Sequence, residues 1–152
     1  MFEGESSRTA ERVANERAAH QVLDWPRVLE DPLATRVITP DHARLLREHP
    51  ERHETSPVAR FTRAIVVVRS RVAEDELAAA VPRGVRQYLV LGAGFDTFAY
   101  RNPFPEVRVF EVDHPWTQRV KRDRLAAAGI TIPSNVTYAP CDFGERSLDD
   151  AL

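Results

Sequence analysis

Helical periodicity dominates the first half of the chain. Residues 8–23 are rich in Ala, Glu and Arg, follow a serine pair that can cap a helix, and end at Asp24-Trp25-Pro26. The Thr39-Pro40 pair, a cap residue followed by proline, predicts a short second helix that runs to about Glu48. A third helix is predicted from Ser56-Pro57 to about Val81. Its apolar residues recur at alternating steps of three and four and form one continuous stripe, namely Val58, Phe61, Ile65, Val68 and Val72.

From Gln87 onward the pattern changes to short apolar runs. The runs at 88–91, 107–112 and 136–139 have the character of buried parallel strands, and a helix is predicted between the last two, from Pro115 to about Ala128. Strands that alternate with a helical segment predict an α/β fold built on a doubly wound sheet with helices on both faces. Three strands make only half of such a sheet, so we expect a fold that is truncated after the third strand.

Length and composition set the domain organisation and restrict the partners. The 152 residues suit one domain, in which we expect a helical region over 1–84 and the half-sheet over 85–152. A net charge of -2 with scattered arginines gives no reason to expect a nucleic acid or a membrane surface as partner. Cys141 is the only cysteine and no run approaches the roughly 20 apolar residues of a membrane span, so we expect a cytoplasmic protein.

The first strand ends in a glycine turn, Leu91-Gly92-Ala93-Gly94. Glycines at Gly92 and Gly94 let the backbone turn tightly and approach a ligand closely, because no Cβ intervenes. In open α/β sheets, ligands bind at the carboxyl ends of the strands. A turn of this kind also occurs in α/β proteins that bind no ligand there, so a purely structural role stays open.

Acidic residues follow the next two strands. Asp113 lies about 20 residues after the glycine turn, at the end of the second strand, where a carboxylate can accept hydrogen bonds from the two hydroxyls of a ribose. Glu111 lies two positions earlier and is expected on the same face of that strand. Asp142 follows the third strand and is placed to accept from the exocyclic amine of a base. The alternative for Asp113 is a solvated strand end or a helix cap, but the three strand ends together predict a nucleoside site.

The loop chemistry distinguishes between nucleoside cofactors. The third glycine of the G-x-G-x-x-G pattern of nicotinamide enzymes is replaced by Thr97, and Asp96 would lie badly against a pyrophosphate. An acidic loop suits a cationic sulfonium better, which favours S-adenosylmethionine. A nicotinamide-dependent oxidoreductase is kept as an alternative.

The motifs together resemble the leucine carboxyl methyltransferase family, which includes bacterial polyketide-type O-methyltransferases. The resemblance extends along nearly the whole chain. It is carried by Thr9-Ala10, Arg17-Ala18, Asp31-Pro32-Leu33-Ala34, Arg69-Ser70-Arg71, Leu91 to Thr97, Tyr100-Arg101, Phe110 to Pro115 and Lys121. It implies a Rossmann-like class I methyltransferase fold, with the helical region as a cap over the cofactor site, and it implies members that continue with further strands.

The resemblance also implies roles for individual residues. Gly92 would contact the cofactor, Asp113 would hold the ribose hydroxyls, and Asp142 and Phe143 would border the adenine. Arg69 would bind the methionine carboxylate with its planar guanidinium. Arg17 is a second candidate for the same carboxylate.

The expected function is S-adenosylmethionine-dependent methyl transfer to a carboxylate or hydroxyl oxygen of a small molecule. A carboxylate acceptor needs no general base, and the sequence identifies none for a hydroxyl. No metal site is expected, because the spacing of the histidines matches no metal motif. The alternative is a non-catalytic remnant of such an enzyme.

Overall fold

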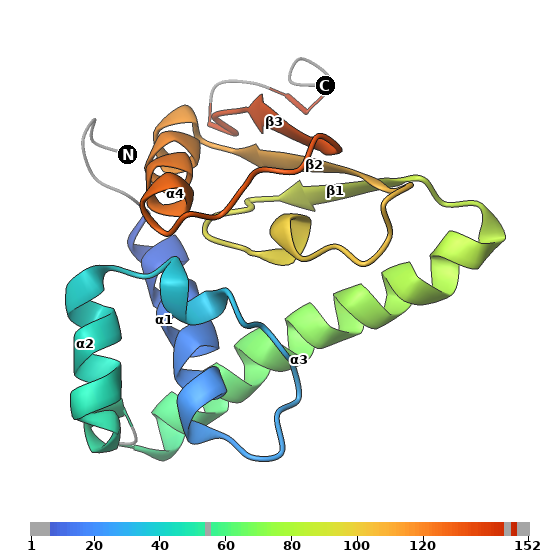
Figure 1. Ribbon diagram of the computed structural model, residues 1–152. Coiled ribbons are helices and arrows are strands. Elements are labelled where there is room, and N and C mark those ends of the chain that lie inside the picture. Colours follow the sequence, from blue (N-terminus) through green and yellow to red (C-terminus); the bar gives the residue numbers. More distant parts are fainter. Residues whose placement is uncertain (1–6, 54–55, 145–146, 149–152) are drawn as a thin grey trace.

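The computed structural model describes residues 7–53, 56–144 and 147–148. A helical region precedes the sheet, and its long third helix starts beside the other two helices and continues below the sheet (Figure 1). The helices are α1 (Arg8–Leu23), α2 (Pro40–Glu48), α3 (Pro57–Ala80) and α4 (Pro115–Ala127), and the strands are β1 (Gln87–Leu91), β2 (Arg108–Asp113) and β3 (Val136–Pro140).

Local capping chemistry sets the starts of the first three helices. The side-chain oxygens of Ser7, Thr39 and Ser56 each accept a hydrogen bond from the backbone N–H three residues later, at 3.2–3.3 Å. Pro40 and Pro57 occupy the first helical positions. An N–H at this position has no acceptor within the helix, so proline loses no hydrogen bond there. These contacts confirm the helix starts predicted from the sequence.

The three strands form one parallel sheet in the order β1-β2-β3. Leu89 pairs with Phe110, and Phe110 pairs in turn with Thr137, so the carboxyl ends of all three strands meet at one edge of the sheet. The α/β class and the parallel sheet are therefore confirmed. Among the strands that the structure describes, β1 pairs with β2 alone and forms one edge of the sheet.

The helices of the described chain pack on one face of this sheet. Leu77 at the end of α3 shares a hydrophobic cluster with Val109 of β2, and Lys121 of α4 bonds to Glu111, which lies two positions from Val109 on the same face. On the opposite face, Leu89 and Leu91 are 38% and 55% exposed. The sequence predicted helices on both faces, and the described residues supply them on one.

The apolar stripe of α3 faces away from the protein. Val58 and Phe61 are 68% and 67% exposed, and the other three members of the stripe are also exposed. The buried side of α3 includes Arg63, which is 2% exposed and forms a bidentate ion pair with Asp24 at 2.8 and 3.0 Å. Because this pair holds the side of α3 that carries Arg63 against the end of α1, the stripe on the other side is turned outward.

The helical region and the sheet share one packed junction. Ala14 and Ala18 of α1 form a buried cluster with Ile38 and Leu46, and Phe95 from the loop after β1 inserts into the same cluster. The loop after β1 is therefore packed against the helical region rather than only against its own sheet.

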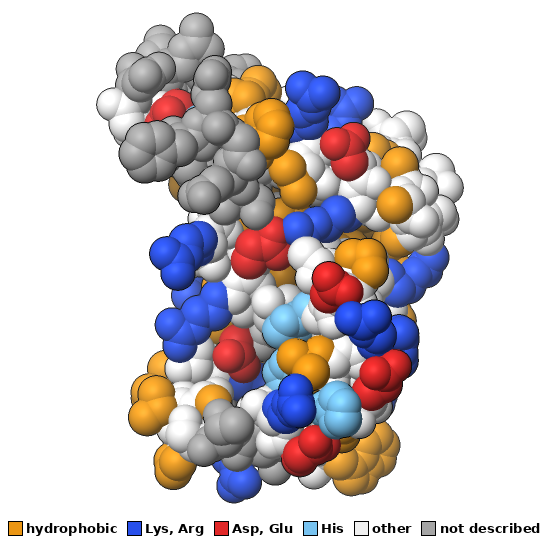
Figure 2. Space-filling model, turned by 90° about the vertical axis from the view of Figure 1, so that its left-hand side faces the viewer, with side chains coloured by type: hydrophobic (Ala, Val, Ile, Leu, Met, Phe, Trp, Pro, Cys, Tyr) orange, Lys and Arg blue, Asp and Glu red, His pale blue; other side chains and the backbone are white. Residues whose placement is uncertain are grey.

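Charges of both signs are interspersed on the side of the molecule drawn in Figure 2. No single-signed patch of the kind that binds a nucleic acid backbone is visible on that face. Within the described residues, no helix combines the length and the apolar character that a membrane span requires.

Candidate functional site

The glycine turn after β1 adopts backbone conformations that favour glycine. Gly92 has φ 64° and Gly94 has φ 47°, both in the left-handed region. The N–H of Ala93 donates to the carbonyl of Val112 at 3.1 Å, which joins the turn to β2. A Cβ on Gly94 would lie 3.0 Å from the Cβ of Ala10, so α1 packs directly against this turn.

A cavity of about 510 Å³ lies beside the glycine turn. Its walls come from α1, α3, β1, the turn itself and the end of β2. The lining residues are Ser7, Thr9, Ala10, Val13, Ala14, Arg17, Val66, Arg69, Ser70, Ala73, Glu74, Tyr88, Val90, Leu91, Gly92, Ala93, Gly94, Phe95, Asp96, Phe98 and Asp113. Of the residues predicted as cofactor contacts, the structure brings Arg69, Gly92, Gly94 and Asp113 to this one cavity, together with Arg17.

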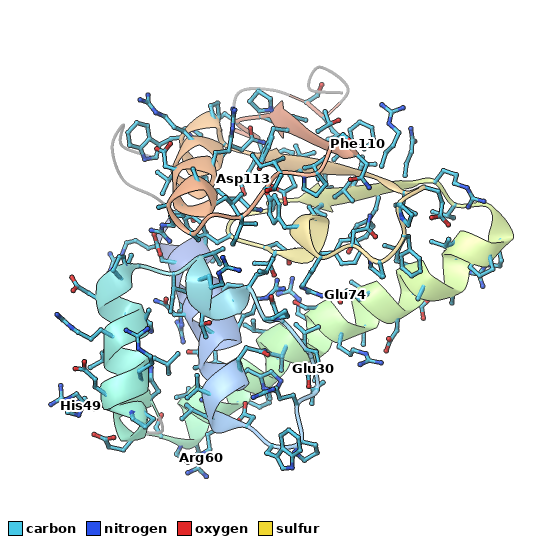
Figure 3. The ribbon with its side chains drawn as sticks, viewed as in Figure 1. Glu30, His49, Arg60, Glu74, Phe110 and Asp113 are labelled. Atoms are coloured by element: carbon cyan, nitrogen blue, oxygen red, sulfur yellow. The ribbon has the colours of Figure 1, made fainter. Side chains whose placement is uncertain are left out.

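Asp113 stands at the carboxyl end of β2, next to the glycine turn (Figure 3). Its Oδ2 accepts from the backbone N–H of Gly94 at 2.6 Å, and its Oδ1 accepts from the N–H of His114 at 2.7 Å. These bonds hold the carboxylate in one orientation while it remains partly exposed on the cavity wall. Each oxygen keeps a further lone pair with which to accept from a ligand hydroxyl.

Two arginines line the cavity in different states. Arg69 on α3 is exposed, and its guanidinium has no hydrogen bond or ion pair with any other described residue. Arg17 on α1 is 3% exposed and bonds to two carboxylates, those of Asp31 and Asp96. Burial acts to lower the pKa of Arg17, but the two carboxylates outweigh it and raise the pKa above its ordinary value. Among the described residues that line the cavity, Arg69 alone has a guanidinium without a hydrogen-bond or ion-pair partner.

Asp96 forms an ion pair with Arg17. It is therefore not the free acid beside a sulfonium that the sequence predicted. Burial raises the pKa of this carboxyl, but Arg17, Lys121 and the N–H of Phe98 outweigh that effect and lower the pKa to about 2. The carboxylate is ionised, and its charge is taken up by Arg17. The acidic character of the loop therefore does not select the cofactor.

Glu111 lies outside the cavity, although it was predicted as a cofactor contact together with Asp113. It is 1% exposed, and its Oε2 accepts from Lys121 Nζ at 2.7 Å and from the hydroxyl of Tyr100 at 2.9 Å. Burial raises the pKa of Glu111 above its ordinary value, against the opposing effect of Lys121. Glu111 and Asp113 share a face of β2, but α4 covers the position of Glu111 and leaves the strand end open.

Asp142 and Phe143 also lie outside the cavity lining. They follow β3, and the N–H of Cys141 bonds to the carbonyl of Asp113 at 2.9 Å, which keeps this segment beside the end of β2. Asp142 Oδ2 lies 3.5 Å from His114 Nε2, and Phe143 is 52% exposed.

The polar contacts that surround the turn are not predictable from the sequence. Thr97 is 1% exposed and donates to Asp31 Oδ2 at 2.5 Å, so the threonine at the third-glycine position belongs to a buried network. Glu74 points from α3 toward the segment after β1 (Figure 3), where it pairs with Arg101. The motifs that contain Asp31, Thr97 and Arg101 had been noted, but nothing in their spacing indicated that they meet.

Around one cavity the structure places a glycine turn after the first strand, an anchored acid at the end of the second and an unpaired guanidinium from α3. In open α/β sheets, ligands bind at this edge of the sheet. The model of the leucine carboxyl methyltransferase family matches residues 10–152 of the chain. The chain belongs to this family.

Individual relatives agree with the family match. The chain is 33% identical over 173 aligned residues to "Putative S-adenosyl-L-methionine-dependent methyltransferase YktD" of Bacillus subtilis, an alignment that covers all of this chain and 57% of the relative. It is 36% identical to a relative of the same type of name from Mycobacteroides abscessus, over 80% of this chain and 40% of that protein. A third, from Parafrankia, is 44% identical over 62% of this chain and 31% of its own length. The chain thus spans about half of the length of the Bacillus subtilis relative and less of the other two.

Proposed function

We propose that this chain carries the cofactor site of an S-adenosylmethionine-dependent methyltransferase. The observation that carries the proposal is the meeting of Asp113, the glycine turn and Arg69 around one cavity, in a chain of the leucine carboxyl methyltransferase family. The names of the relatives specify the same cofactor.

Each residue has a distinct part in holding the cofactor. Asp113 accepts from the ribose hydroxyls, and the small surface of Gly92 and Gly94 lets the cofactor lie close to the backbone. Arg69 pairs with the carboxylate of the methionine part, because its guanidinium is the uncommitted cation of the cavity. Asp142 and Phe143 border the adenine from beyond β3, beside the end of β2. Glu111 does not contact the cofactor in this proposal. Its ion pair with Lys121 stabilises β2 on the face that α4 covers.

Residues 1–84 act in this proposal as a cap over residues 85–152. α1 supplies five of the lining residues and packs on the glycine turn, so a ligand in the cavity is shielded on that side. Bound S-adenosylmethionine would supply an electrophilic methyl group for an acceptor oxygen. The chain's own contribution is to orient the cofactor and exclude water. We propose a small molecule with a carboxylate or hydroxyl as acceptor, and a cytoplasmic location, which the single buried Cys141 supports.

Two alternatives differ in what they predict for binding. A non-catalytic remnant would bind the cofactor weakly or not at all. A nicotinamide-dependent oxidoreductase would bind NAD, but the position of the third glycine in such enzymes is occupied by Thr97, whose side chain is buried and bonded to Asp31. The S-adenosylmethionine site therefore has the stronger structural support.

Calorimetric titration with S-adenosylhomocysteine tests the proposal. We expect saturable binding by the wild-type chain and none with NAD. Asp113→Asn keeps an acceptor for the N–H of Gly94 but removes the ionised carboxylate, and it is expected to weaken binding by about tenfold or more, the effect of losing hydrogen bonds to a charged group.

The matched control is Asp41→Asn, an acid on α2 that is 90% exposed and forms an ion pair with Arg44 in its own helix. It is expected to bind as the wild type does. Absence of S-adenosylhomocysteine binding by a folded wild-type chain would favour the remnant, and NAD binding would favour the oxidoreductase.

A further inference from the structure

Arg17 occupies the junction between α1 and the glycine turn, and its terminal nitrogens are already bonded. Nη1 donates to Asp96 Oδ2, and Nη2 donates to Asp31 Oδ2 at 2.8 Å and to Thr97 Oγ1 at 3.2 Å. Nε is buried and has no hydrogen-bond partner within the described residues. A guanidinium that balances two carboxylates has no net charge to offer a third.

The partners of Arg17 tie together segments that are far apart in the sequence. Asp31 belongs to the turn after α1, and Asp96 and Thr97 follow the glycine turn 79 and 80 residues from Arg17. Asp96 also accepts from the N–H of Phe98 at 2.7 Å through its other oxygen. Arg17 therefore holds the loop directly after Gly94 through a carboxylate that is itself anchored to the backbone.

Two apolar contacts join the same segments. α1 approaches Gly94 so closely that a Cβ there would lie 3.0 Å from Ala10, and the side chain of Phe95 is inserted into the helical cluster around Ala14 and Ala18. The glycine turn is thus held from α1 at three successive points, Gly94, Phe95 and Asp96. The contact at Asp96 is an ion pair with Arg17, so a substitution that removes one of the two charges breaks it and leaves the apolar contacts at Gly94 and Phe95 in place.

We propose that Arg17 is a positioning residue that shapes the cofactor loop through Asp96 and Asp31, and that it makes no contact with the ligand carboxylate. The inference rests on the proposed function for the ligand, but the loop geometry that it concerns exists without one. It separates the two arginines of the cavity by role: Arg69 binds, and Arg17 holds the loop in the shape to which the cofactor binds.

The two roles differ in their dependence on the ligand. S-adenosylhomocysteine carries the amino-acid carboxylate, and 5′-methylthioadenosine has the same nucleoside without it. Arg17→Gln is expected to weaken both ligands by a similar factor of about tenfold, because the whole loop is affected. The matched variant Arg69→Gln is expected to weaken S-adenosylhomocysteine alone and to leave 5′-methylthioadenosine within about twofold.

The variant Asp96→Asn distinguishes an Arg17 that positions the loop from one that binds the ligand carboxylate. The two roles predict opposite changes in the affinity for S-adenosylhomocysteine. If Arg17 positions the loop, Asp96→Asn weakens both ligands, as Arg17→Gln does. If Arg17 binds the ligand carboxylate, Asp96→Asn frees it from a competitor and tightens S-adenosylhomocysteine. Asp96 is 23% exposed, so this variant remains folded more readily than one at a fully buried site and covers the case in which Arg17→Gln does not fold.

Hydrogen exchange of the loop tests the positioning role without any ligand. The amides of residues 92–98 are expected to exchange faster in Arg17→Gln than in the wild type, and to be unchanged in Arg69→Gln. Unchanged exchange in Arg17→Gln, a loss confined to S-adenosylhomocysteine, or tighter binding by Asp96→Asn would overturn the proposal. Faster exchange in a chain whose wild type binds neither ligand would support the positioning role and count against the proposed function only.

Discussion

Two regions of the molecule are opposites in composition and in burial. One is the junction between α1 and the glycine turn, and the other is the outer side of α3. The junction is rich in charge, yet Arg17 and Asp31 are 3% and 0% exposed. The outer side of α3 is apolar, yet Phe61 is 67% exposed and Val58 is 68% exposed. Charged side chains are buried at the junction beside the apolar cluster of Ala14, Ala18 and Phe95, whereas the apolar side chains on the outer side of α3 are exposed.

Pairing explains how the charges are accommodated. Every buried charge at the junction has an opposite charge within hydrogen-bond distance, and such pairs are tolerated when their geometry is good and the remaining lone pairs are satisfied. Glu111 likewise has an opposite charge within hydrogen-bond distance, because its Oε2 accepts from Lys121 and from Tyr100. The comparison shows that burial in this protein is decided by available partners as much as by hydrophobicity.

The largest effect is expected from breaking the junction at Asp31. This carboxylate is fully buried and accepts from Arg17, Thr97 and the N–H of Leu33. Asp31→Ala leaves Arg17 with one counter-charge, and we expect the free energy of unfolding to fall by about 3–5 kcal/mol. Urea unfolding measures the change. Asp41→Ala is the exposed control, and a loss for Asp31→Ala no larger than that of this control would contradict the account.

A smaller effect is expected on acidification, through Asp96. The folded-state pKa of this carboxyl is lowered from an ordinary value of 3.8 to about 2, because Arg17, Lys121 and the N–H of Phe98 outweigh the effect of its burial. A lowered folded-state pKa adds stability that is fully present above the unfolded-state pKa and is lost as the pH falls through the folded-state value. The chain should therefore lose on the order of 2 kcal/mol between about pH 5 and pH 2 from this group.

The variant Asp96→Asn isolates that contribution. Its stability should depend less steeply on pH in this range than the stability of the wild type, as followed by urea unfolding at a series of pH values. Identical pH profiles for the two proteins would mean that Asp96 carries no ionic stabilisation.

The smallest effect is expected on the outer side of α3. Phe61→Gln replaces a mostly exposed ring and should change the free energy of unfolding by no more than about 0.5 kcal/mol. Leu77→Ala, on the buried side of the same helix at 5% exposure, should cost about 2–5 kcal/mol. A large loss for Phe61→Gln in thermal or urea unfolding would mean that the stripe is packed in solution, which the described residues do not show.

Local chemistry explains which parts of this fold could be predicted from the sequence. The starts of α1, α2 and α3 were found because Ser7, Thr39 and Ser56 cap backbone groups only three residues away. The strand ends that bear Gly92 and Asp113 were found because parallel strands bring their carboxyl ends together.

Contacts between distant segments account for what was missed. The rotation of α3 is set by the pairing of Arg63 with Asp24, 39 residues away, and no periodicity contains that information. The alternation of a strand correctly places Glu111 and Asp113 on one face, but it does not say that α4 covers the first and leaves the second open. Arg17 was recognised as a basic residue near the site, and only its partners 14 and 79 residues away show that it is already paired.

The crystal structure of the chain soaked with S-adenosylhomocysteine would test the central claim most directly. The account predicts the ligand in the cavity beside Gly92 and Gly94, with its ribose hydroxyls on Asp113, its carboxylate on Arg69, and the Arg17–Asp96 pair unbroken. A ligand whose carboxylate displaces Asp96 from Arg17, or one bound away from Asp113, would contradict the account.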